Sequence, residues 1–258
     1  MGRFIWIFWA WVCSASSLVQ PASASEDLLV PNPTELSGTW YLRIRTATDA
    51  RIPIIGTTHI RSTTHLLATI QDTPSGLTQT QQTCSVDNRP SRSITRTVLP
   101  EAFIAHLPIK TYPVQLTTKP DGTIDYSADL KQQYVGYDGA KANGTIPDSR
   151  KHPAVFDWDE DGFPGASVLI DIPLFGHIRI YLVQTNHTFL QGVVVSTDRV
   201  EGTTHQRLLN QRTIGADNRL FAANPKLTVG TGHDHFEMMR IEEGATCKDI
   251  VRLAEGSF

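Results

Sequence analysis

This chain of 258 residues has no large excess of either charge, few cysteines and little helical periodicity. Its 23 basic and 26 acidic residues leave a formal net charge of −3, without the clustered Lys and Arg that nucleic-acid binding requires. The sequence also has no P-loop, no Gly-x-Ser-x-Gly and no His-Glu-x-x-His. We therefore expect no nucleic-acid partner, and none of these motifs points to an enzyme class. The 40% hydrophobic content is enough for a folded core.

The longest apolar run lies at the N-terminus. Residues 1–24 have the three parts of a secretory signal peptide: Arg3, an apolar stretch over residues 4–13, and the cleavage motif Ala22-Ser23-Ala24. The apolar stretch is shorter than the roughly 20 residues of a spanning helix, although an uncleaved anchor is the alternative. We expect cleavage near Ala24 and a soluble, periplasmic or extracellular mature chain without a transmembrane segment.

Two cysteines, Cys84 and Cys247, remain after that cleavage. In an oxidising compartment, a lone pair of cysteines is most simply one disulfide. The alternative is a pair of buried free thiols. The sequence therefore predicts a disulfide between Cys84 and Cys247.

Alternation of apolar and polar residues dominates the rest of the chain. Over residues 38–45, one face carries Trp40, Leu42 and Ile44 and the other carries arginines, as in a half-buried strand. Further strand-like stretches cover residues 58–70, 77–86, 92–99, 166–172, 177–184, 188–196, 202–214 and 236–241. This alternation predicts a sheet in which Trp40 is a core anchor.

Helical patterns are short. One stretch, which Pro100 opens and Pro108 ends, carries Phe103 and Leu107 four residues apart. A second pattern covers residues 242–253. Together with the strand-like stretches, they predict an all-β protein, an antiparallel barrel or sandwich with one or two short helices.

The domain organisation allows two interpretations. After the signal peptide, residues 25–35 are predicted to be an N-terminal linker and residues 36–258 a single β-rich domain. Residues 137–153 are rich in Gly, Lys, Asp and Pro and show little periodicity. Two halves, 36–136 and 154–258, are therefore the alternative.

One local motif has the chemistry of a metal site. Asp157, Asp159 and Asp161, followed by Gly162, form the front half of a calcium loop, in which alternate carboxylates converge on one hard cation. The back half departs from an EF-hand, because Val168 stands where a bidentate Glu is usual. The motif predicts a structural Ca²⁺ site and no other cofactor. The alternative is an acidic turn whose Asp side chains cap backbone N–H groups.

Two stretches resemble parts of known families. Gly38-Thr39-Trp40 resembles the Gly-x-Trp opening of lipocalins and related calycin barrels, in which a Trp of the first strand closes the barrel floor. The acidic motif resembles single-turn Asp-x-Asp-x-Asp-Gly loops of secreted β proteins. With the late Cys247, these features resemble exported bacterial β-rich proteins. The resemblance implies a calycin-like fold and brings no activity with it.

The sequence says less about the function of the protein than about its fold. His233 and His235 could bind a transition metal with a third ligand, or belong to a plain loop. No residue stands in a catalytic motif. We expect an exported binding or structural protein that holds a small apolar ligand or an envelope component. The alternative is a secreted hydrolase whose site is assembled from dispersed acidic and histidine residues.

Overall fold

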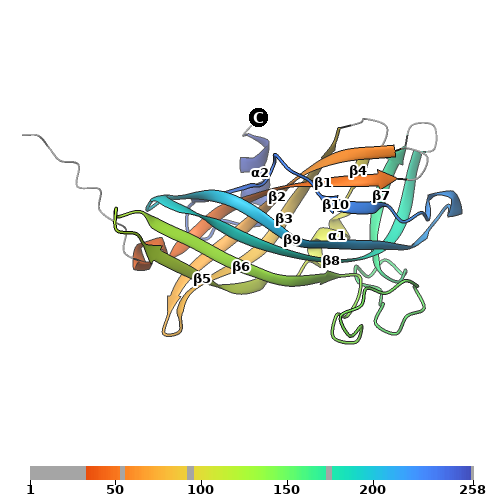
Figure 1. The fold of residues 1–258 in the computed structure, drawn as a ribbon, viewed down its shortest axis with the longest axis horizontal. Helices are drawn as coiled ribbons and strands as arrows, with labels where there is room; N and C mark the ends of the chain where they lie inside the picture. Colours follow the sequence, from red (N-terminus) through yellow and green to blue (C-terminus); the bar gives the residue numbers. More distant parts are fainter. Residues whose placement is uncertain (1–32, 53–55, 92–95, 173–175, 257–258) are drawn as a thin grey trace, which may run out of the picture.

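The computed structural model describes residues 33–52, 56–91, 96–172 and 176–256. The predicted signal peptide lies outside these ranges, as does most of the predicted linker. The described residues form eleven strands, all paired antiparallel, and two short α-helices (Figure 1), which confirms the predicted all-β fold. No helix among them is long and apolar enough to cross a membrane.

The elements follow one another closely along the chain. The strands are β1 Gly38–Ile52, β2 Gly56–Thr73, β3 Gly76–Pro90, β4 Arg96–Val98, β5 Lys110–Thr118, β6 Ile124–Val135, β7 Ala166–Ile172, β8 Gly176–Ser196, β9 Arg199–Ala216, β10 Lys226–Val229 and β11 His235–Arg240. The α-helices are α1 Glu101–Ala105 and α2 Cys247–Glu255, and short 3-10 turns occupy η1 Pro33–Leu36 and η2 Arg219–Phe221.

Eight of the strands form a closed ring. The order is β1, β2, β3, β5, β6, β8, β9 and β11, and β11 pairs with β1 again. The ring is elongated and is not an even barrel (Figure 1). The two predicted halves supply adjoining parts of the ring, β1 to β6 and β8 to β11, and they meet where β1 pairs with β11 and where β6 pairs with β8.

The two ends of the ring have different walls. β1 pairs with β11 over residues 40–45 and with β10 over residues 48–51. β8 pairs with β6 over residues 184–193 and with β7 over residues 176–182. One end is therefore bordered by β5, β6 and β11, and the other by β4, β7 and β10 (Figure 1). We call them the packed end and the hollow end.

Trp40 anchors the packed end. Its side chain is fully buried in the largest hydrophobic cluster, which confirms its prediction as a core residue. The indole Nε1 donates to the Leu36 carbonyl at 3.0 Å, and the Arg240 guanidinium of β11 lies 4.6 Å from the ring centroid. Arg240 also donates to the Ser37 carbonyl at 2.8 Å. Gly38 has a φ of 141°, and a Cβ there would collide with the same guanidinium.

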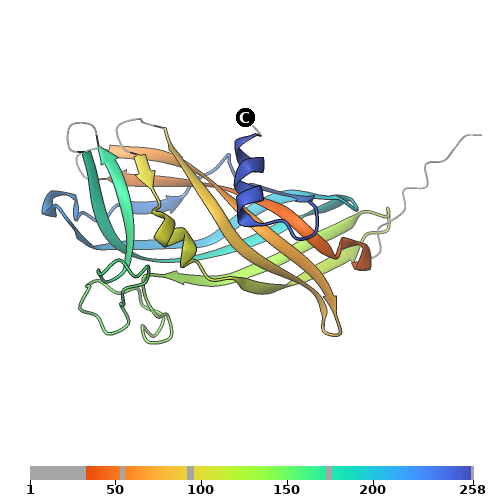
Figure 2. The same ribbon diagram turned by 180° about the vertical axis from the view of Figure 1, so that it is seen from behind.

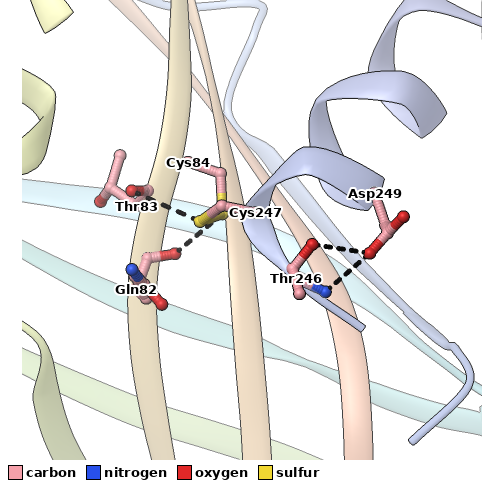
Figure 3. Close-up of a disulfide and its surroundings, with 6 residues drawn as sticks. All are labelled: Gln82, Thr83, Cys84, Thr246, Cys247 and Asp249. Carbon is pink, nitrogen blue, oxygen red and sulfur yellow. Dashed lines mark hydrogen bonds between the residues drawn. A yellow bond between two sulfur atoms is a disulfide. The ribbon is translucent and has the colours of Figure 1, made fainter. Parts of the chain in front are cut away.

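The predicted disulfide is confirmed. Cys84 is the unpaired residue of a bulge in β3, where the register with β2 shifts, and such a bulge re-aims a side chain. Cys247 is the first residue of α2, and the two Cα atoms lie 5.0 Å apart (Figure 3). Asp249 accepts from the Thr246 backbone N–H at 2.9 Å, which caps the helix start. The bond fastens α2 to the outside of β2 and β3 (Figure 2).

A buried polar pair lies on the outer face of the ring where α2 packs. Tyr41 and His65 are almost fully buried, and Tyr41 Oη lies 2.6 Å from His65 Nδ1. His65 Nε2 lies 3.4 Å from the Asp87 carboxylate. Burial lowers the pKa of His65, although Asp87 opposes the shift. Burial therefore favours the neutral form of this ring in the folded protein.

The strand pattern was more continuous than the sequence indicated. Residues 177–184 and 188–196, predicted as separate strands, both belong to the 21-residue β8. β5, β6 and β10 were not predicted. The alternation in β6 breaks at a bulge near Lys131, whose φ is 52°, and this hides its period of two.

We predict that Trp40→Ala lowers the free energy of unfolding by about 3–5 kcal/mol, the range for truncating a large core residue. The loss has two sources, an unfilled cavity and the removed surface under Arg240. Urea denaturation followed by circular dichroism measures it. Val195→Ala, at an exposed position of β8, is the control and should change stability by less than about 0.5 kcal/mol. Equal effects of both variants would contradict the anchoring role.

We predict that replacing both disulfide cysteines with Ser destabilises the protein strongly. The covalent loop spans 163 residues, for which the chain-entropy model gives an upper figure of roughly 5 kcal/mol. Urea denaturation of the double variant measures the loss, with Ser85→Ala as a neighbouring control. Mass spectrometry of the unreduced protein should show both thiols blocked, and efficient labelling of both would contradict the bond.

We predict that His65 makes the protein less stable as the pH falls below about 6.5, the ordinary histidine value. There the unfolded chain takes up a proton that the buried ring does not, so the equilibrium shifts toward unfolding. His65→Gln should remove this part of the pH dependence between pH 5 and 7.5, measured by urea denaturation. An unchanged dependence would assign the effect to other groups.

Candidate functional site

The hollow end of the ring encloses a cavity of about 760 Å³. Most strands contribute to its lining, together with α1 and η2. Cavities of roughly 300–1,000 Å³ are typical of small-molecule sites. The exposed residues Pro108 and Ala223 belong to the lining, so the cavity reaches the surface beyond α1 and beyond η2.

The lining carries no formal charge. Every described residue that lines the cavity is either apolar or a neutral hydrogen-bonding residue such as Thr, Gln, Asn or Tyr. Charged residues make up 19% of the chain, and in the described part they all lie outside this lining. The strands thus separate an uncharged interior from a charged exterior through their alternating side chains.

Amide side chains gather in the middle of the cavity. The register places Gln184 of β8 opposite Gln211 of β9, and Gln133 of β6 opposite Asn186 of β8. We call the six amide residues of this zone the amide belt: Gln81, Gln133, Gln184, Asn186, Gln206 and Gln211. On β8 the belt follows the apolar residues Ile180 and Leu182 and precedes the packed core.

Members of the amide belt differ in their hydrogen bonding. Gln133 donates to Tyr112 Oη at 2.7 Å and accepts from Lys110, whose pKa burial lowers. Gln81 Nε2 and Gln206 Oε1 are buried atoms without a hydrogen-bond partner among the described residues. An unsatisfied buried amide costs about 1–3 kcal/mol. Gln81 and Gln206 thus carry unpaired buried amide atoms, whereas Gln133 is hydrogen-bonded.

A helix forms part of the cavity wall. α1 lies against β3 and β7 (Figure 2). Its Phe103 belongs to the lining of the cavity. Pro100 precedes the helix, as the sequence predicted, and Leu107 beyond its end also lines the cavity. The Phe103 ring lies 5.2 Å from the ring of Trp158, between centroids. Trp158 belongs to the segment of the predicted calcium motif, so that segment supports the wall from outside.

The acidic motif forms a tight loop, residues 157–165, which we call the acidic loop. Asp157 accepts backbone N–H groups from Asp161 at 3.1 Å and from Gly162 at 2.9 Å. Gly162 has a φ of 91°, which a side chain would disfavour. One carboxylate oxygen from each of Asp157, Asp159 and Asp161 lies within 4.8 Å of the other two. The loop thus has the caps of an acidic turn and also a converging set of carboxylates.

Asp159 is the buried member of this set. Its Oδ2 accepts the Ser167 N–H of β7 at 2.8 Å, whereas Oδ1 has no hydrogen-bond partner among the described residues. Desolvation raises the pKa of Asp159, the Ser167 N–H opposes this, and the carboxylates of Asp161 and Asp157 raise it further. Arg179 approaches Asp161 at 3.7 Å from the outside.

The histidines do not assemble into a second site. Among the described residues, the acidic loop is the one place where three or more side chains that could hold a metal ion come together. His235 begins β11 and its nearest carboxylate, Glu237, is 4.0 Å away, while His233 lies in the preceding loop. The sequence predicts a small ligand but predicts neither the residues that line the cavity nor their lack of charge. The nearest signal of the cavity is the run of inward polar residues along β8 and β9.

Comparison with protein-family models, with curated proteins and with solved structures finds no match for this chain. The class that its fold and site define is therefore an all-β protein with a closed ring of strands, an uncharged internal cavity and one disulfide.

Proposed function

We propose that this protein is an exported binding protein that holds a small uncharged molecule in the cavity at the hollow end. The molecule has an apolar body and at least one neutral hydrogen-bonding group. An uncharged component of the cell envelope has this chemistry. The observation that carries the proposal is the uncharged lining of a cavity of about 760 Å³.

The lining favours neutral over charged ligands. A charged group would lose its hydration in the cavity without gaining an opposite charge, at a cost of several kcal/mol. A hydroxyl, ester or amide would exchange its hydrogen bonds with water for hydrogen bonds with amide side chains of the lining. The apolar body would gain about 25 cal/mol for each Å² buried against the walls. The two parts of the lining thus favour an amphiphilic, uncharged ligand.

The proposed export rests on the sequence of residues 1–24. The disulfide supports it, because such bonds persist in oxidising compartments and are rare in the cytosol. The Gly-x-Trp start is consistent with a calycin-like cup, in which Trp40 would close the end opposite the cavity; Trp40 belongs to the buried cluster of the packed end.

The same lining supports binding over hydrolysis. Acid–base catalysis needs a titratable side chain within hydrogen-bond reach of the substrate. The described lining contains no Asp, Glu, His, Lys or Cys. Of the tyrosines Tyr112 and Tyr134 in the lining, Tyr112 is unsuited to proton transfer near neutral pH, because burial raises its pKa to about 12.

We predict that the protein binds the neutral dye Nile red and that an alcohol displaces the dye better than the matching carboxylate. Dodecanol and dodecanoate at pH 8 have the same chain length and differ in charge. Because no described residue of the lining is positively charged, dodecanol should compete at a concentration at least about tenfold lower. Dye fluorescence measures the competition. Equal competition, or a preference for dodecanoate, would contradict the proposed selectivity.

A pair of neighbouring variants locates the dye. Gln211 lines the cavity, whereas Asn210 is exposed on the outer face of the same strand. Gln211→Trp fills part of the cavity and should weaken dye binding at least tenfold, while Asn210→Trp should leave it unchanged. Circular dichroism checks that both variants fold. Unchanged binding in a folded Gln211→Trp variant would place the dye elsewhere.

A further inference from the structure

The acidic loop contains a buried carboxylate oxygen whose hydrogen-bonding capacity is unmet. Asp159 is 2% exposed, and its Oδ1 has no partner among the described residues. Removing an ionised carboxylate from water without pairing it is costly. The fold nevertheless directs this side chain inward, with Oδ2 fixed by the Ser167 N–H at 2.8 Å. The free oxygen therefore suits a positively charged ligand.

The neighbouring carboxylates meet the distance requirement for one shared ion. An oxygen from each of Asp157, Asp159 and Asp161 lies within 4.8 Å of the other two. Oxygens that bind the same Ca²⁺ at 2.3–2.6 Å can be at most about 5 Å apart. Small side-chain adjustments are therefore enough to bring the three carboxylates to one ion.

We propose that the acidic loop binds a single Ca²⁺ ion through Asp157, Asp159 and Asp161. An all-oxygen, carboxylate set selects a hard cation, whereas zinc prefers nitrogen and sulfur ligands. Mg²⁺ demands a strict octahedron at about 2.0–2.1 Å and gives up its waters reluctantly, so an irregular loop favours Ca²⁺.

The affinity is moderate. The loop has Val168 where an EF-hand has a bidentate Glu, and Arg179 competes for Asp161 at 3.7 Å. Other charges nearby are Glu160, which is exposed, and His106, which lies 3.7 Å from it. These features place the dissociation constant at about 10⁻⁴–10⁻³ M, the range of extracellular calcium modules.

The bound ion stabilises the cavity wall. Trp158 lies between two of the ligands in the sequence and packs against Phe103, which lines the cavity. Asp159 is also tied to the start of β7 through Ser167. An ion that fixes Asp157 and Asp159 thus fixes the support of α1 and β7. The site exists whether or not the cavity holds a ligand.

Terbium luminescence tests the site directly. Tb³⁺ replaces Ca²⁺ at oxygen sites and emits when a neighbouring Trp is excited, and Trp158 is next to two ligands. The purified protein should give Trp-excited Tb³⁺ emission that millimolar Ca²⁺ displaces and equal Mg²⁺ displaces poorly. In parallel, Ca²⁺ should raise the melting temperature progressively toward a plateau relative to EDTA, because it binds the folded state.

Matched variants assign the ligands. Asp159→Asn and Asp161→Asn should each lower Ca²⁺ affinity at least tenfold, whereas Glu160→Gln removes the same charge from the exposed face of the loop and should keep the emission. If a variant misfolds, isothermal titration of the unaltered protein with Ca²⁺ still measures whether the ion binds. The proposal is overturned if Ca²⁺ displaces no emission, if calcium and EDTA give identical melting curves, or if folded Asp159→Asn binds normally. None of these readouts depends on the cavity ligand.

Discussion

The need to pair the backbone of five long strands shapes this molecule. Strands β1, β2, β3, β8 and β9 run from 15 to 21 residues each, and an unpaired buried N–H or C=O is costly. On one edge of β1, and on one edge of β8, no single strand pairs along the whole strand. On one edge of β1, β11 gives way to β10, and on one edge of β8, β6 gives way to β7. The exchange of partners divides the ring into two ends with different walls.

That division explains why one ring is both solid and hollow. At the packed end, large side chains such as Trp40, Tyr126 and Phe236 fill the interior. At the hollow end, inward positions of the same strands hold smaller or polar residues such as Thr46, Ser62 and Asn186, and space remains between them. β2 pairs with the whole of β3, but on the opposite edge of β3 the described pairing with β5 ends at Gln81, and α1 contacts β3. The wall there depends on side-chain packing rather than on a ladder of backbone hydrogen bonds.

The features predicted from sequence are those with a local signature. The alternation around Trp40 predicted a strand and its buried face. Cys84 and Cys247, the two cysteines outside the predicted signal peptide, predicted the disulfide. The Asp-x-Asp-x-Asp-Gly spacing placed three carboxylates together, and they are together. The strand and the acidic loop follow from residues that are close in sequence, and the disulfide follows from the number of cysteines.

The cavity has no such signature. Its lining residues come from strands up to about 180 positions apart, and each is an ordinary residue, such as Thr, Gln or Leu, in its own strand. Pairing registers bring them together, and registers with bulges, such as those near His65 and Lys131, shift the inward face by one residue. The buried, unpartnered oxygen of Asp159 was equally hidden, because burial of one carboxylate depends on where β7 begins.

Ring closure also determines how the chain acquires its structure. β1 is made early in synthesis, yet one of its edges pairs with β11, which lies about 200 residues later. Until that segment arrives, β1 presents an open edge that can pair with other chains. Contacts over such separations make folding slow, because loop entropy is lost before pairing compensates for it. The disulfide joins β3 to α2, the helix that follows β11, so once formed it keeps the C-terminal part of the chain close to the sheet whose edge β11 must pair.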